Sequence, residues 1–148
     1  MRIALASDHA GFALKTELAN WLGDSGHDVL DLGTTSEESV DYPEFGARLA
    51  RAIASGDAER GIAVCGSGIG IAIAINRFAD CRCAHVNEPL SAELARTHND
   101  ANILALGARL VGSDMARRCV SAFLGSDFAG GRHQRRVDQL SNLLEDSD

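Results

Sequence analysis

The chain has no apolar run long enough to span a membrane, and its first apolar stretch is too short for a signal peptide. These two absences predict a cytoplasmic protein with no membrane partner. Lysine is almost missing: Lys15 is the only one, and the other thirteen cationic residues are arginine. The formal net charge of −7 argues against a general nucleic-acid binder, which would carry an excess of positive charge. Arginine is, however, the better planar clamp for a phosphate group.

The cysteines also lack the spacing of a metal site. Cys65, Cys81, Cys83 and Cys119 form no CxxC pair, and no histidine or cysteine stands at zinc-ligand spacing from them. Without a secretion signal, we expect free thiols. The 148 residues, 45% hydrophobic and 24% charged, have the composition of one globular domain over residues 1–148 with a real core.

Short apolar segments alternate with helical patterns along the whole chain. The segments that read as strands are residues 2–7, 27–32, 62–64, 82–86 and 102–106. Apolar residues at helical spacing predict helices at 14–22, 45–53, from the turn at 65–70 towards residue 78, 89–95 and 114–124. This alternation predicts a parallel sheet covered on both faces, which is a three-layer α/β fold.

One further amphipathic helix follows a glycine-containing joint at residues 125–131. Its apolar positions are Val137, Leu140, Leu143 and Leu144. It lies beyond the five strand–helix units and has no strand of its own to cover. We therefore expect it to pack on a second subunit in a dimer, with residues 145–148 frayed.

The most informative stretch is the turn Cys65-Gly66-Ser67-Gly68-Ile69-Gly70, which follows the third strand. Its three glycines allow positive φ and close approach of a ligand, and the N–H groups that open the next helix suit an anion. Cys65 stands at the carboxyl end of the strand, where open α/β sheets bind their ligands, and a thiol near a helix N-terminus can act as a thiolate. The turn does not match GxxxxGK[ST], and its evenly spaced glycines match GxGxxG only loosely. It therefore establishes no nucleotide site.

Other polar residues are predicted near this edge of the sheet. Asp8 and His9 follow the first strand, whereas His98 and Asn99 lie in a polar loop, Thr97–Asp100, that precedes the fifth strand. Such a loop begins at the opposite edge, which favours a site built between two chains. Structural explanations also stand: Asp8 could cap the first helix, and His98 could bond the local backbone.

Taken together, these residues resemble the type B ribose-5-phosphate isomerase family, which includes the galactose-6-phosphate and allose-6-phosphate isomerases. The resemblance covers nearly the whole chain. Its segments are Ser7-Asp8-His9-Ala10-Gly11-Phe12, Asp41-Tyr42-Pro43, the turn at 65–70, Asn87-Glu88-Pro89, His98-Asn99-Asp100-Ala101-Asn102 and residues 130–136.

The resemblance implies an enzyme that interconverts ribose 5-phosphate and ribulose 5-phosphate through a cis-enediolate. It implies a Rossmann-like sandwich, a homodimer or dimer of dimers with sites shared between subunits, and neither cofactor nor metal. By resemblance, Cys65 is the base that moves a proton between carbons 1 and 2, and His98 assists ring opening. The positions that match substrate-binding residues are Asp8, His9, Gly66, Ser67, Gly68, Ile69, Gly70, Asn99, Arg109, Arg132 and Arg136, with His9, Arg132 and Arg136 nearest the phosphate.

Two alternatives remain open from the sequence. The same chemistry could act on a six-carbon sugar phosphate such as allose 6-phosphate. A non-catalytic flavodoxin-like module that binds a nucleotide or flavin would explain the fold and the glycine turn, but not Cys65, His98 and the two arginines together.

Overall fold

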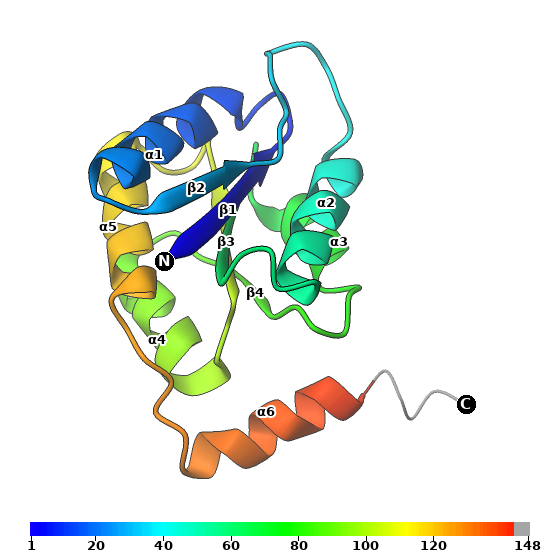
Figure 1. Cartoon of the computed structure of the whole chain (residues 1–148), viewed down its shortest axis with the longest axis vertical. Coiled ribbons are helices and arrows are strands. Elements are labelled where there is room, and N and C mark those ends of the chain that lie inside the picture. Colours follow the sequence, from blue (N-terminus) through cyan, green and yellow to red (C-terminus); the bar gives the residue numbers. More distant parts are fainter. Residues whose placement is uncertain (144–148) are drawn as a thin grey trace.

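The computed structural model describes residues 1–143, which form one five-stranded sheet between two layers of helices (Figure 1). The strands are β1 (Arg2–Ser7), β2 (Asp28–Asp31), β3 (Arg60–Cys65), β4 (Cys83–His85) and β5 (Ile103–Gly107). They lie in the order β2-β1-β3-β5-β4, and every pair is parallel. The predicted three-layer, Rossmann-like α/β sandwich is confirmed.

Helices follow the strands as the apolar spacing predicted. They are α1 (Phe12–Asp24), α2 (Tyr42–Ala54), α3 (Ile69–Ile75), α4 (Pro89–Asn99), α5 (Ser113–Leu124) and α6 (Arg132–Asn142). The predictions for Leu144 and for fraying of residues 145–148 lie outside the described residues.

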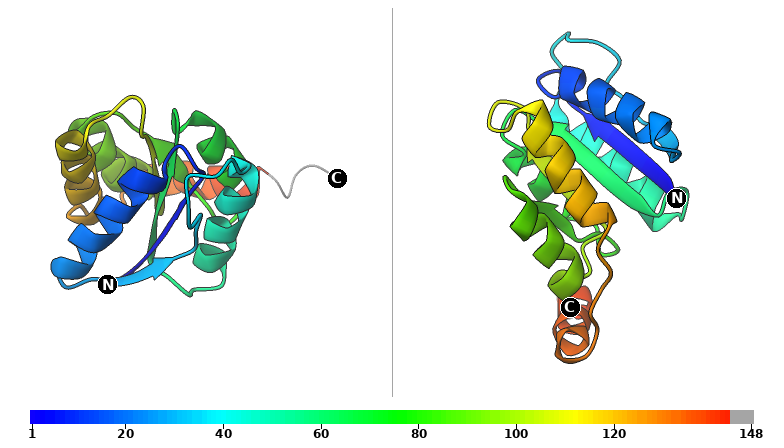
Figure 2. Two further views of the ribbon diagram at one scale, coloured as in Figure 1. Left: turned by 90° about the horizontal axis from the view of Figure 1, so that it is seen from above. Right: turned by 90° about the vertical axis from the view of Figure 1, so that its left-hand side faces the viewer.

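The two faces of the sheet differ in the size of their side chains. Ile3, Leu5, Ile62 and Val64 point to the face that α1, α4 and α5 cover, and together they form one core. The residues between them along the strands are mostly alanines, and these pack beneath α2 and α3 in a second core. Figure 2 shows the two helical layers on either side of the sheet. Since side chains alternate along a strand, Cys65 belongs to this second face.

Helix α6 stands apart from the sandwich at the end of the molecule (Figure 1). Val137 is its buried residue within the described range, whereas Leu140 and Leu143 are 48% and 62% exposed. An apolar face is thus left open towards solvent. Within residues 1–143 no helix combines the length and the apolar character needed to cross a bilayer.

The loop between β2 and α2 is anchored by a buried lysine. The Lys15 ammonium is 1% exposed and lies 2.7 and 2.8 Å from the two carboxylate oxygens of Asp31. Asp31 also accepts the Gly33 N–H at 2.9 Å. The ion pair therefore holds the start of the loop, whose far end, at Val40, reaches His9.

Candidate active site

The turn after β3 places a thiol at the carboxyl edge of the sheet. The Cys65 sulfur accepts the Gly68 N–H at 3.1 Å, so the turn folds back on the side chain that precedes it. Gly68 has φ +80°, and a Cβ there would lie 2.7 Å from the His85 ring and 2.8 Å from the Leu106 backbone. Only glycine fits this position without a shift of its neighbours.

A cavity of about 320 Å³ opens at this turn. It is lined by Asp8, Tyr42, Cys65, Gly66, Ser67, Gly70, Arg109 and Leu110. The volume falls in the range of small-molecule sites. The cavity thus brings together a thiol, a carboxylate, a guanidinium and a glycine-rich turn.

Asp8 and His9 lie where β1 ends. Asp8 is 6% exposed, and its Oδ1 accepts the Gly11 N–H at 3.1 Å. The prediction that Asp8 is the N-cap of α1 is wrong, because Gly11 is the capping residue and Asp8 closes the turn before it. The Val40 N–H lies 3.1 Å from Nδ1 of His9, so the loop after β2 orients this ring.

Arg109 lies across the turn from the loop after β5. Its backbone N–H donates to the Gly66 carbonyl at 3.0 Å. A Cβ built on Gly66 would be 3.1 Å from Nη1 of Arg109, so the guanidinium lies directly against this glycine. Arg109 therefore places a positive charge at the wall of the cavity.

A second group of predicted residues gathers where α4 meets α6. The rings of His98 and His133 are stacked, with centroids 4.3 Å apart and planes inclined by 13°. Arg132 and Arg136 lie on the exposed surface of α6. Burial, followed by the charges of His98, Arg132 and Arg136, lowers the pKa of His133 below its usual value.

The predicted loop at Thr97–Asp100 is wrong: α4 continues through Asn99. The helix ends at Asp100, which has φ +47°. Arg96 and Arg82 lie 2.8 and 3.1 Å from the Asp100 carboxylate and hold it at the end of the helix. Arg96 belongs to the same helix, whereas Arg82 precedes β4, and the sequence pattern gives no sign of this second, distant contact.

The two groups lie at opposite edges of the sheet. Strand β3 pairs with β5 so that Gly61 faces Ile103 and Cys65 faces Gly107. Cys65 is thus four residues, or about 13 Å along the strand, from the level at which β5 begins. His98 precedes β5 and lies at that amino edge, as does the start of α6 (Figure 1). One chain therefore does not bring His98, Asn99, Arg132 and Arg136 to the Cys65 cavity.

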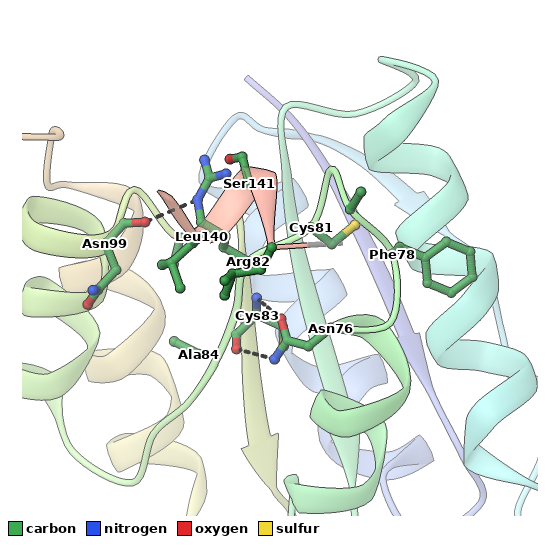
Figure 3. Close-up of a pocket in the computed structure, with 12 residues that line it drawn as sticks. Asn76, Phe78, Cys81, Arg82, Cys83, Ala84, Asn99, Leu140 and Ser141 are labelled. Atoms are coloured by element: carbon green, nitrogen blue, oxygen red, sulfur yellow. Dashed lines mark hydrogen bonds between the residues drawn. The ribbon is translucent and has the colours of Figure 1, made fainter. Parts of the chain in front are cut away.

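A different cavity, of about 480 Å³, receives Asn99. Figure 3 shows it between the edge strand β4 and the end of α6, with the Asn76 side chain bonded to both backbone groups of Cys83. Burial raises the pKa of Cys81 to about 11 and raises that of Cys83 further. These two cysteines are therefore protonated near neutral pH and offer no base.

The structure adds residues to the candidate site that the sequence analysis did not predict there. Tyr42 and Leu110 line the Cys65 cavity, and His133 stacks on His98. Tyr42 and His133 lie inside the motifs that the sequence displays, but nothing in the spacing separates them from packing residues. Ile69, by contrast, is 50% exposed and lines a neighbouring cavity instead. Among residues 1–143 no cluster of three or more His, Cys, Asp or Glu side chains could hold a metal ion.

Comparison with known proteins adds independent information. The sequence model of the Ribose/Galactose Isomerase family matches residues 3–140. Ribose-5-phosphate isomerase B of Escherichia coli (strain K12) is 46% identical over 142 residues, which cover 96% of this chain and 95% of that protein.

Solved structures agree with this match. The ribose-5-phosphate isomerase B structure from Clostridium thermocellum has a TM-score of 0.98 and 45% identity, and the match covers all of both chains. The Mycoplasma genitalium enzyme with bound ribulose-5-phosphate has a TM-score of 0.93 and 35% identity, and the match covers 99% of this chain and 97% of that one.

Proposed function

The chain belongs to the Ribose/Galactose Isomerase family, and from this membership we propose that it interconverts ribose 5-phosphate and ribulose 5-phosphate. The main support for this function is the 46% identity to a ribose-5-phosphate isomerase B over 96% of the chain. The flavodoxin-like alternative has no such support, because these relatives are isomerases.

Cys65 is the proposed base. Isomerisation requires removal of the proton on carbon 2 of the opened aldose and delivery of a proton to carbon 1. The electrons of the broken C–H bond form the double bond of an enediolate. The Cys65 sulfur lines the cavity and accepts a backbone N–H, and such a donor stabilises negative charge on the sulfur. A general base in reach of this proton typically contributes about 10²–10⁴-fold to the rate.

The walls of the cavity supply groups for the charge that develops on the sugar oxygens. The turn from Gly66 to Gly70 carries backbone N–H groups, which cost no reorganisation during the reaction. The Arg109 guanidinium lies against Gly66, and Asp8 lies on the same cavity. We assign these residues to the carbon-1 and carbon-2 end of the substrate, where donors to an enediolate are needed.

The phosphate end requires a second chain. The proposed phosphate ligands Arg132 and Arg136, and the ring-opening residue His98, lie at the sheet edge opposite to Cys65. A homodimer solves this separation if His98 and α6 of one chain reach the cavity of the other. His9, next to the cavity residue Asp8, is then the phosphate ligand that the Cys65 chain supplies.

The surface of α4 supports such a dimer. Leu90 and Leu94 are 61% and 37% exposed, and His98 follows four residues later. Residues four apart lie on one helix face, so an apolar stripe leads from the carboxyl edge of the sheet to His98. A two-fold axis across the middle of this stripe places His98 of one chain near the Cys65 edge of the other. The cytoplasmic location expected from the sequence remains a prediction, to be checked by cell fractionation.

The test compares substrates and one pair of cysteine variants. The purified chain is assayed with ribose 5-phosphate and with allose 6-phosphate. We expect a higher kcat/KM for the pentose. Cys65→Ala should lose at least about 10²-fold in kcat while still binding the substrate. Cys81→Ala, which removes a buried thiol elsewhere, should retain kcat. Absence of activity on ribose 5-phosphate contradicts the function, and normal turnover by Cys65→Ala contradicts the role of the base.

A further inference from the structure

The backbone that precedes His133 places this residue against His98. Gly130 and Gly131 have φ of +61° and +55°, a conformation that glycine adopts readily. The Ala129 N–H donates to the Thr97 carbonyl at 3.0 Å and ties this segment to the end of α4. The His133 N–H then donates to the Gly130 carbonyl at 3.0 Å. The sharp turn of the chain at these two glycines thus brings the first turn of α6 onto His98.

The stack is what restrains the His98 ring. Among the described residues, neither nitrogen of His98 has a hydrogen-bond partner, so no polar contact sets the plane of this imidazole. The His133 ring covers one face of it at 4.3 Å and is nearly parallel.

Burial and the charges nearby favour the neutral form of His133. Burial is the first cause that lowers its pKa, and the charges of His98, Arg132 and Arg136 act in the same direction. A neutral ring adds no further positive charge beside His98. It is therefore suited to serve as a flat support rather than as a phosphate ligand.

We propose that His133 is a positioning residue for His98, whose imidazole it holds in the plane needed for opening the sugar ring. This inference rests on the proposed function. In ring opening the hydroxyl on carbon 1 loses its proton, the bond between carbon 1 and the ring oxygen breaks, and the ring oxygen gains a proton. Carbon 1 becomes the aldehyde carbon. An imidazole that exchanges both protons must face the two oxygens, and a misplacement of about 1 Å costs about 10²-fold in such reactions.

The experiment separates ring opening from proton transfer between carbons. Ribulose 5-phosphate carries its phosphate on the oxygen that would close a five-membered ring, so it stays open. Exchange of its carbon-1 hydrogen with solvent deuterium, followed by NMR, therefore needs Cys65 but not ring opening. Turnover of ribose 5-phosphate needs both. The variants are His133→Ala, His133→Phe, which keeps a flat ring, and Gln134→Ala as the neighbouring control on α6.

We expect His133→Ala to lower kcat on ribose 5-phosphate by about 10- to 100-fold, with KM and the deuterium exchange rate changed by less than about threefold. His133→Phe should restore most of kcat, and Gln134→Ala should match the wild type. The proposal is overturned if His133→Ala has normal kcat, if it raises KM instead, if deuterium exchange falls together with turnover, or if His133→Phe is as slow as His133→Ala. A wild-type protein inactive in both assays refutes the proposed function itself, which distinguishes the two failures.

Discussion

A chain with Cys65→Ala and a chain with His98→Asn should each be inactive alone and regain activity when they assemble together. The reason is the separation of the two residues within one chain. Cys65 ends β3 at the carboxyl edge, whereas His98 precedes β5, whose first residue pairs about 13 Å from Cys65 along β3. Proton transfer needs contact at about 3 Å, so the proposed dimer pairs Cys65 of this chain with the partner's His98.

The expected magnitude follows from two-fold symmetry. In a mixed dimer one site combines both substitutions, and the other combines an intact Cys65 with an intact His98. One of two sites is then wild type, so the mixed dimer should have about half of the wild-type kcat. A statistical mixture of equal amounts contains about half mixed dimers and should show about a quarter.

The assay uses co-expression of the two chains with different affinity tags and purification over both. Homodimers of each variant, purified in the same way, give the background. KM of the mixed dimer should equal that of the wild type, because its active site has every native residue. If the mixed dimer is no more active than the two homodimers, Cys65 and His98 do not form a shared site, and the two-chain arrangement is wrong.

Three further predictions concern other parts of the structure. Arg136→Ala should raise KM for ribose 5-phosphate by about 10- to 100-fold, because a charged phosphate contact is lost. The control Arg135→Ala should change KM by less than about threefold. Equal effects of the two variants in steady-state assays would show that only the overall charge matters. Asp31→Ala should lower the free energy of unfolding, measured by urea titration, by about 3 kcal/mol, because Lys15 stays buried without its partner. Lys15→Met should leave the free energy of unfolding nearly unchanged. The opposite ranking of the two variants would contradict the role of the ion pair. Gly68→Ala should cost about 2–5 kcal/mol from its positive φ and its contacts with neighbouring backbone, and thermal unfolding at wild-type temperature would refute this.

The fold was predictable because its two periodicities are local. Apolar strands and amphipathic helices alternate along the chain, and the parallel sheet with covered faces follows from that alternation. The predicted strands all exist, with ends shifted by a few residues. The end of α4 was not predictable, because Asp100 is held there by Arg82, which precedes β4, as well as by Arg96 of the same helix.

The candidate site also has a part that was predictable from the sequence and a part that was not. The chain order was enough to place Cys65 and the glycine turn at one sheet edge together with Asp8. The stacking of His133 on His98 depends on two glycines with positive φ, which direct the start of α6 back onto α4. No spacing rule predicts a contact between rings that are 35 residues apart in the sequence.

The sequence by itself determined the layers, the parallel sheet and the position of a thiol at the carboxyl end of a strand, since these depend on periodicity and on residues adjacent in the chain. Only the tertiary structure decided which polar residues share a cavity. It joined Arg109 to the Cys65 turn, and it brought α6 with Arg132 and Arg136 to the far edge, where the sequence had already predicted His98. The physical reason is that strand length and pairing register set the distance between the two edges, and the sequence does not state a register.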